Sequence, residues 1–499
     1  MMQATRRYGK TLNIFLLLSC LAVGFGVTNA LAFSDEVMDT FLGGGVTTLA
    51  RGGLEKLPAE PETLDFDAPL YLDSKEAYRI ETGYEGRLTA KVYDGRWKGS
   101  IAESDRLETV IAAPFSLSGG SIKGSVAAGY GYNGYDLRAV NDKEDTYVHT
   151  KENYEAVKGG VYLKAFEKVS LAASIIDTDY RKAPETPLEL EVAALRWLRV
   201  GYQHAYSNFA TNLDLRLLGH EGNLPLRSVE SIDSLYLKLD YPGVRAKFSQ
   251  ELGYGKNRRL EAKVDLPKSW YLVGAYHRRD YDDMDQSFTV DGIPSGYVKG
   301  ALRKQAVRAG VGTKFPNGWN LEANFRHSST AFDGGGLASS LAVAGFWPSL
   351  IVGNYNYLTS ASISANQYHI GGEFTGERYS FGVGVQYIDL KPAAQVDYWR
   401  SSIFGLGNSD ADSKKLTVQR IGLIFLGAGV GYKWKYIEAK YAVGQFIPVS
   451  VRDSEEDEPP SPTAAPGGGD GRSIFSEIAD KIRHYPGGGL HRLLVSVTF

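Results

Sequence analysis

The chain has very little sulfur and lacks the apolar runs of a helical membrane protein. Cysteine occurs once and methionine 4 times in 499 residues. This excludes a disulfide scaffold, a thiolate metal site and a covalently attached c-type haem. Mean hydropathy is −0.24, and the apolar stretch at residues 12–23 is shorter than the roughly 20 residues of a membrane-spanning helix. A helical protein with several membrane spans is therefore excluded as well.

The N-terminus has the layout of a secretory signal peptide. Three basic residues precede the apolar stretch, and residues 30–32 form an A-x-A cleavage site. We expect residues 1–32 to be removed, together with Cys20, the only cysteine. Two alternatives stay open, namely an uncleaved membrane anchor and lipidation of Cys20, which follows a loose lipobox. The pattern predicts an exported protein.

The charge balance gives no reason to expect a nucleic-acid partner. The chain has 55 Lys and Arg against 58 Asp and Glu, and loss of residues 1–32 removes three basic residues and no acidic ones, which leaves 52 against 58. Phosphate backbones are bound by clustered positive charge. A mildly acidic chain of mixed signs has no such surplus.

From about residue 77 apolar and polar residues alternate. Residues 259–266 are the clearest case, with Leu260, Ala262, Val264 and Leu266 between Arg259, Glu261, Lys263 and Asp265. Successive side chains of a strand point to opposite faces. Such a segment therefore predicts a strand with one aliphatic and one charged face. The same pattern recurs in residues 235–241, 319–326 and 379–387.

The connections between the expected strands alternate between short and long. Tight turns are expected at residues 166–168, 242–243, 267–269, 316–318 and 376–377, and long polar loops at 138–152, 280–301, 327–365, 391–414 and 449–489. Short turns at one rim and long loops at the other are typical of transmembrane β-barrels. Aromatic residues near the strand ends suit the two membrane interfaces; they include Trp270, Tyr271, Trp319, Tyr368, Tyr379 and Tyr387.

The C-terminal residues are a further feature typical of transmembrane β-barrels. Leu493, Val495 and Val497 alternate with other residues up to the terminal Phe499, while His491 occupies a position where an aromatic is common. This resembles the carboxy-terminal signature of bacterial outer-membrane β-barrel proteins. The resemblance implies a porin-like protein of the bacterial outer membrane, surrounded by its lipid. It also implies that the last strand carries the signal read by the barrel-assembly machinery.

We therefore predict an all-β fold, a transmembrane antiparallel β-barrel over residues 74–499. It has about 18 strands (16 to 20), short periplasmic turns and long extracellular loops. An even strand number leaves both termini on the periplasmic side. Closure is required because every backbone N–H and C=O group in lipid must be hydrogen-bonded. Strands are expected to begin near residues 77, 105, 120, 153, 168, 188, 198, 231, 244, 259, 269, 305, 319, 366, 378, 415, 436 and 490.

Three segments do not fit the barrel pattern. Residues 33–73, in which Ser34 is placed to cap a short helix, are either a plug in the lumen or an unstructured periplasmic tail. Residues 327–365 include the apolar run 341–352. We expect this loop to fold against the inner wall and narrow the channel, the alternative being strand extensions above the membrane. Residues 449–489 are acidic and rich in Gly and Pro, hence solvated, apart from one expected helix with an isoleucine stripe (Ile474, Ile478, Ile482).

Motifs for catalysis or cofactor binding are nearly absent. Residues 129–134 match the letters G-x-G-x-x-G, but they end an expected strand and no helix follows to hold a pyrophosphate. There is no H-E-x-x-H motif and no nucleophile elbow. His277, His327 and His369 near strand ends are the only candidates for a hydrolase site. We expect neither an enzyme nor a cofactor nor a metal.

The charged strand faces are the candidate functional site. With the aliphatic faces toward lipid, the charged faces line the lumen and set a field that acts on passing solutes. We expect a porin-like channel for passive diffusion of small hydrophilic solutes or ions. Two alternatives are a sheath around a periplasmic partner such as an electron-transfer cytochrome, and a hydrophobic-substrate transporter with an N-terminal hatch. Charges that merely pair with each other and fill the wall are a further alternative. The predicted lining residues are Lys238, Arg245, Lys247, Arg259, Glu261, Lys263, Arg308, Glu322, Arg326, Glu373 and Glu438.

Overall fold

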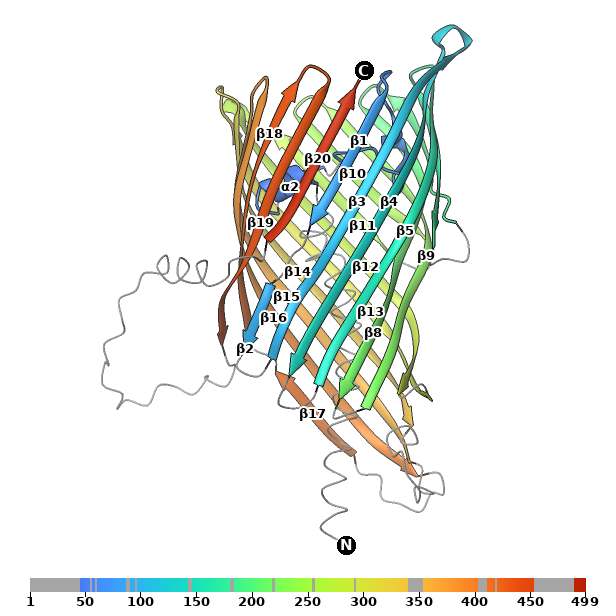
Figure 1. Ribbon diagram of the computed structural model, residues 1–499, viewed down its shortest axis with the longest axis vertical. Coiled ribbons are helices and arrows are strands. Elements are labelled where there is room, and N and C mark those ends of the chain that lie inside the picture. The colour runs from blue at the N-terminus through green and yellow to red at the C-terminus, as the bar shows by residue number, and fades with distance from the viewer. Residues whose placement is uncertain are drawn as a thin grey trace, which may run out of the picture.

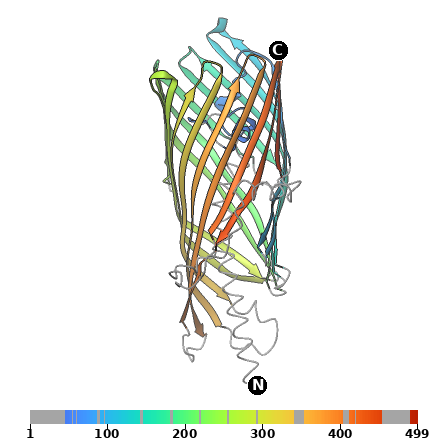
Figure 2. The ribbon, with the colours of Figure 1, turned by 90° about the vertical axis from the view of Figure 1, so that its left-hand side faces the viewer.

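The computed structural model shows a tall barrel of tilted strands (Figures 1 and 2). It describes residues 45–53, 56–58, 61–86, 90–94, 97–141, 146–179, 184–217, 220–253, 256–290, 293–339, 353–402, 411–417, 420–452 and 489–499. Several predicted features lie outside the described residues. These are the signal peptide, the helix expected after Ser34, the apolar run 341–352 and the isoleucine stripe.

The described residues form twenty strand segments, one short α-helix and three 3-10 turns. The helix is α2 (Val46–Ala50), and the 3-10 turns are η3 (Pro69–Leu72), η4 (Ser118–Gly120) and η5 (Pro267–Ser269). The strands are β1 (Arg79–Gly86), β2 (Ala90–Asp94), β3 (Trp97–Leu117), β4 (Ile122–Asn141), β5 (Thr146–Ala165), β6 (Val169–Thr178), β7 (Leu188–Leu195), β8 (Leu198–Leu217), β9 (His220–Tyr241), β10 (Val244–Leu252), β11 (Arg258–Asp265), β12 (Trp270–Val290), β13 (Ile293–Lys314), β14 (Trp319–Ser339), β15 (Gly353–Thr375), β16 (Tyr379–Ser402), β17 (Ala411–Thr417), β18 (Arg420–Trp434), β19 (Ile437–Arg452) and β20 (Gly489–Thr498).

The sheet closes on itself with 18 strand positions. Neighbouring strands are antiparallel, and β1 pairs with β20, with Arg79 opposite Thr498 and Gly86 opposite His491. β1 and β2 both pair with β3, and β17 and β18 both pair with β16, so each of these two pairs fills one position. The fold class and the strand count predicted from the sequence are confirmed.

The strand starts agree best at the rim with the short turns. Strands that begin there start within two residues of the predicted positions. At the other rim several strands begin earlier, for example at Trp97, Thr146 and Ile293 rather than near 105, 153 and 305. Above the lipid level both faces of a strand meet water, so the alternation of apolar residues stops while the hydrogen-bonded ladder continues.

Four of the predicted long loops are consequently wrong over much of their length. Residues 138–152, 280–301 and 391–414 lie largely in paired strands, and so do the described parts of 327–365. Residues 327–339 of β14 pair with residues 354–366 of β15. For these residues the strand extension is correct, and the inward fold that we preferred is not.

The two faces of the wall differ as predicted. Exposed aliphatic side chains such as Val157, Leu272, Ile370 and Val383 form a belt on the outside, while polar and small residues alternate with them on the inside. The short turns lie at the rim that also carries the C-terminus (Figure 1). A closed barrel with an outward aliphatic belt belongs in the bacterial outer membrane, with this rim in the periplasm. Among the described helices, none has the length and apolar character to cross a bilayer.

The last strand shows the same division. Leu493 and Phe499 are exposed on the outward face of β20, and Val495 and Val497 share that face. Their role as an assembly signal stays a prediction.

Candidate functional site

All eleven predicted lining residues lie on the inner face of the wall. On β9 to β15 and on β19 they alternate with exposed outward residues, for instance Leu237, Leu260, Val307, Phe325 and Ile370. The set comprises Lys238, Arg245, Lys247, Arg259, Glu261, Lys263, Arg308, Glu322, Arg326, Glu373 and Glu438. Their part in conduction stays a prediction.

Many inward charges have partners of opposite sign on the wall itself. Glu191 accepts from Lys238 at 2.9 Å and from Arg199 at 3.1 Å. Arg259 pairs with Glu261 two residues away on the same face. Lys440 and Glu438 are 3.1 Å apart. Many charges of the lining are therefore paired with each other. For these residues the alternative that the charges merely pair and fill the wall holds.

A stretch of chain before the first strand lies inside the barrel. We call residues 45–53, 56–58 and 61–74 the inner segment. Its helix α2 contacts β16, β18, β19 and β20, and its turn η3 contacts β4, β5, β6 and β7. Both ribbon views show α2 within the barrel, on the side of the rim that carries the C-terminus (Figures 1 and 2). The inner segment thus reaches separate sectors of the wall across the lumen.

The α2 end packs on glycines of the wall, at positions 382, 384 and 427, which we call the glycine seat. A Cβ atom at Gly384 would collide with the carbonyl of Arg51, and one at Gly427 with the carbonyl of Leu49. At Gly382 a Cβ atom would lie 2.8 Å from Cβ of Ala50. Only glycine lets the two backbones approach this closely.

Apolar contacts add to the packing of α2 on the wall. Leu49 is fully buried against wall residues of β16, β18, β19 and β20, and Val46 and Ala50 of α2 are buried with it. These wall residues include Ile388, Phe425, Ala442, Leu490 and Leu494.

A buried ion pair follows directly after α2. Arg51 is fully buried, and its Nη2 lies 3.3 Å from Oε2 of Glu322 on β14. Glu322 also accepts from Arg308 at 3.0 Å and from the hydroxyl of Tyr271 at 2.9 Å. Nε2 of His369 donates to the carbonyl of Arg51 at 2.5 Å. The guanidinium keeps two nitrogens, Nε and Nη1, without a hydrogen-bond partner, so this contact is only partly satisfied.

Two sequence expectations change here. Tyr271 is fully buried and faces the lumen, so its assignment to the interface girdle was wrong. Its ring lies under the ammonium of Lys263, 3.6 Å from the ring centre. Glu322, predicted to line the lumen, also contacts the inner segment through Arg51, and Arg308 pairs with Glu322.

The η3 end occupies an apolar socket. Phe66 and Leu72 are fully buried among side chains of β3 to β6. A Cβ atom at Gly129 would lie 2.8 Å from the Phe66 ring, and one at Gly160 would collide with Leu72. Hydroxyl groups of the wall donate to the inner segment, with Ser174 bonding the Phe66 carbonyl at 2.5 Å. Ser125 bonds the Leu72 carbonyl at 2.6 Å in the same way.

Carboxylates of the wall accept from backbone N–H groups of this end. Oε2 of Glu81 accepts from Leu64 at 2.6 Å, and Oε2 of Glu189 accepts from Leu70 at 2.9 Å. The glycines at 129–134 lie within β4, and the next described element is the strand β5 rather than a helix. Gly129 makes room for Phe66, which gives the apparent nucleotide motif a packing role.

The middle of the inner segment makes a third contact. Leu57 packs on Tyr271 and Val273 of β12, and Lys56 pairs with Glu373 of β15 at 2.7 Å. At the η3 end, Tyr71 reaches toward β9, where the ammonium of Lys238 lies 5.7 Å from its ring.

The three histidines considered for catalysis have amide or backbone partners. His277 bonds the side chain of Asn257 at 2.9 Å, and His327 bonds that of Asn366 at 2.8 Å. His369 binds the Arg51 carbonyl as described. In the part of the chain that the structure describes, no three His, Cys, Asp or Glu residues cluster as metal ligands do.

Sequence reasoning missed most partners of the inner segment. Its contacts rest on Arg51, Glu81, Glu189 and two serines, none of which stood out, and on His369, which was considered only as a hydrolase candidate. One signal was present, since glycines recur at alternate inward positions of neighbouring strands, at 382 and 384 and at 427 and 429. Such a run marks a place where something approaches the wall closely.

Comparison with known proteins finds similarity only among solved structures. No protein-family model matches the chain, and no curated protein sequence does either. Among solved structures, OmpT, an outer membrane protein of Vibrio cholerae, in its trimer form, is 7% identical, with a TM-score of 0.35 over 85% of this chain and 98% of that one. OccAB3 of Acinetobacter baumannii is 12% identical, with a TM-score of 0.38 over 85% and 98%. The CymD monoaromatic hydrocarbon channel is 10% identical, with a TM-score of 0.29 over 91% and 96%.

Proposed function

We propose that this barrel is a passive channel for small hydrophilic solutes or ions, narrowed by its inner segment. The observation that supports this most directly is the polar, charged inner wall around a lumen that the inner segment crosses. A barrel of about this strand number leaves an aqueous path unless something fills it. Diffusion along a wetted wall needs neither a cofactor nor a catalytic group.

The charge distribution favours anions over cations. On β9 to β14 the inward basic residues outnumber the acidic ones, while the inner segment carries Glu62, Asp65, Asp67 and Asp73 against Arg51 and Lys56. Opposite signs on two sides of a path orient polar solutes in passing. The basic wall sector is therefore expected to guide the negative groups of a solute.

Planar-bilayer recordings test this proposal. We expect discrete conductance steps, with a reversal potential under a salt gradient that indicates anion preference. Changing Arg259 and Lys263 to Glu should shift that potential toward cations. Arg308, also predicted to line the path, is a poor site for this test because it neutralises Glu322. An absence of conductance steps over a range of salt concentrations would contradict the channel.

A hydrophobic-substrate transporter with a hatch is the second candidate, favoured by the inner segment itself. Its large apolar side chains, Leu49, Phe66 and Leu72, are buried against the wall, so they do not offer an apolar path. Uptake of a monoaromatic hydrocarbon into proteoliposomes without ion conductance would favour this candidate. The sheath alternative meets a steric objection, because a partner entering from the periplasm would find the inner segment in its way.

A further inference from the structure

The outward face of β11 to β13 changes from aliphatic to basic at one level. On β11 the outward residues run from Val264 through Leu260 to Arg258, all on the same face of the strand. On β12 Leu272 is followed by Arg278 at the corresponding level, directly opposite Arg258 in the ladder. On β13 Arg303 shares the outward face and lies opposite Asp280.

Two lysines extend this group. We call Lys256, Arg258, Arg278, Lys299 and Arg303 the basic patch, and all five are exposed. They lie at the edge of the belt on the side away from the short turns, which is the outer leaflet. Asp280 offsets part of the charge, since it pairs with Arg278 at 2.9 Å.

The belt edge is not basic all around the barrel. On β5, β6 and β9 the outward residues at the end of the aliphatic run are Glu155, Asp177 and Asp233. The basic patch is therefore a local feature of one sector.

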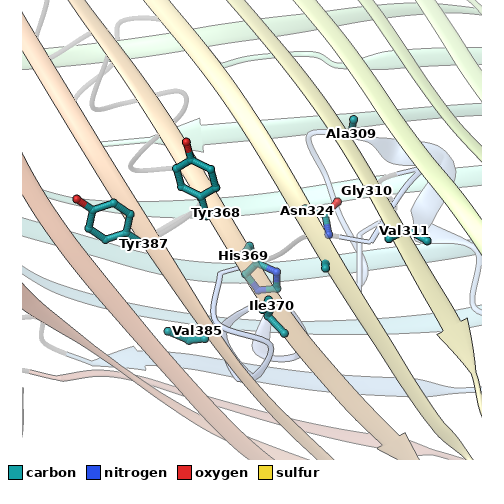
Figure 3. A pocket seen from close by; sticks show the side chains of 10 residues that line it. Ala309, Gly310, Val311, Asn324, Tyr368, His369, Ile370, Val385 and Tyr387 are labelled. Carbon is teal, nitrogen blue, oxygen red and sulfur yellow. The ribbon is translucent and has the colours of Figure 1, made fainter. Parts of the chain in front are cut away.

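An apolar groove lies in the belt beside this patch. It has a volume of about 680 Å³ and crosses the outward face of β13 to β16. Small residues, Ala309 and Ala323, stand between larger ones such as Tyr368, Ile370 and Tyr387. Figure 3 shows these larger side chains on neighbouring strands around the groove. A depression between large side chains on a lipid-facing surface is suited to acyl chains.

We propose that the groove and the basic patch together bind a phosphorylated glycolipid of the outer leaflet. Ala309 and Arg303 lie on the same face of β13, six residues apart. At about 3.3 Å per residue this separation is roughly 20 Å along the strand. With the tilt of the strand, it suits the distance from the acyl chains of a lipid to its phosphate, because half the hydrocarbon core is about 15 Å thick. Anionic headgroups are attracted by clustered basic residues at the membrane surface.

The test uses purified protein in detergent and lipid A as the probe, with the number of bound lipids read by native mass spectrometry. Wild-type protein should bind lipid A with its phosphates at least tenfold more tightly than the same lipid after dephosphorylation. The variant Arg258→Gln, Arg278→Gln, Arg303→Gln should lose this preference. The groove variant Ala309→Leu, Ala323→Leu should bind both lipids more weakly than wild type.

A matched control removes exposed basic residues at the periplasmic rim. Lys168→Gln, Arg196→Gln and Lys433→Gln take away the same charge and should leave the preference intact. Equal binding of both lipids by the wild type would overturn the proposal, as would a basic-patch variant that keeps the wild-type preference. The test does not depend on conduction, so it can fail or succeed independently of the channel.

Discussion

The two ends of the inner segment are held to the wall in different ways. The α2 end rests on bare glycine backbone, packs its apolar side chains against β16 to β20, and is followed by one buried guanidinium, two nitrogens of which have no partner. The η3 end fills an apolar socket and exchanges hydrogen bonds with serines and carboxylates of the wall. It is also joined to β1 by only a few residues. The α2 end is thus the part that small changes should release, and the η3 end is the anchor.

The largest effect is expected from filling the glycine seat. Gly384→Ala places a methyl group where the Arg51 carbonyl lies, so α2 cannot dock, while alanine is acceptable to the strand. Single-channel conductance should rise severalfold. The control is Gly83→Ala, since a Cβ atom at that β1 position has nothing within 4 Å. If both variants have the single-channel conductance of the wild type, docking of α2 on these glycines does not narrow the lumen.

Removing Glu322 should cost more unfolding free energy than removing Arg51, its partner in the buried ion pair. Glu322→Gln leaves two guanidinium groups, those of Arg51 and Arg308, without their carboxylate, and removing one partner of a buried pair typically costs about 3–5 kcal/mol. Arg51→Met should cost much less, because Glu322 keeps Arg308 and Met fills similar volume. Urea unfolding of the reconstituted barrel measures both. An equal loss of unfolding free energy in the two variants would contradict this prediction.

At the η3 end single changes should have smaller effects. Ser125→Ala and Ser174→Ala each leave a carbonyl of the inner segment without its donor, at a cost of about 1 kcal/mol. Conductance should stay at the wild-type value because the chain continues directly into β1. Hydrogen exchange of residues 64–74 reports the local loosening. A jump in conductance in either variant would mean that this end is no anchor.

The smallest effect concerns pH at the same end. Burial, and next the charge of Asp67, raise the pKa of Asp65 from 3.8 to about 6, with Glu108 adding to the shift and Lys158 opposing it. A carboxyl whose pKa is higher in the docked state weakens docking as pH rises from about 4 to 6. Asp65→Asn should therefore stabilise the protein at pH 7 and have no effect below pH 4. Melting temperatures at the two pH values check this, and an equal shift at both would contradict it.

The sequence predicted the barrel well because a strand exposes its two faces with a strict period of two. Residues such as Leu260 and Glu261 therefore reveal which face meets lipid. The same signal ends where both faces are wet, which is why the starts at Trp97 and Ile293 were missed.

The inner segment could not be placed by such reasoning. Arg51 and Glu322 are 271 residues apart in the chain, and no local pattern links them. The recurring glycines at 382, 384, 427 and 429 indicate that something approaches the wall closely, but they do not say which segment of the chain it is. Only the closed barrel brings α2 over Gly384 and Gly427.

The central claim is that the inner segment narrows the lumen. Deleting residues 45–73 and recording single channels in planar bilayers tests it most directly. We predict larger conductance steps after the deletion than in the wild type. Unchanged conductance after the deletion, in a barrel that folds and inserts normally, would contradict the account.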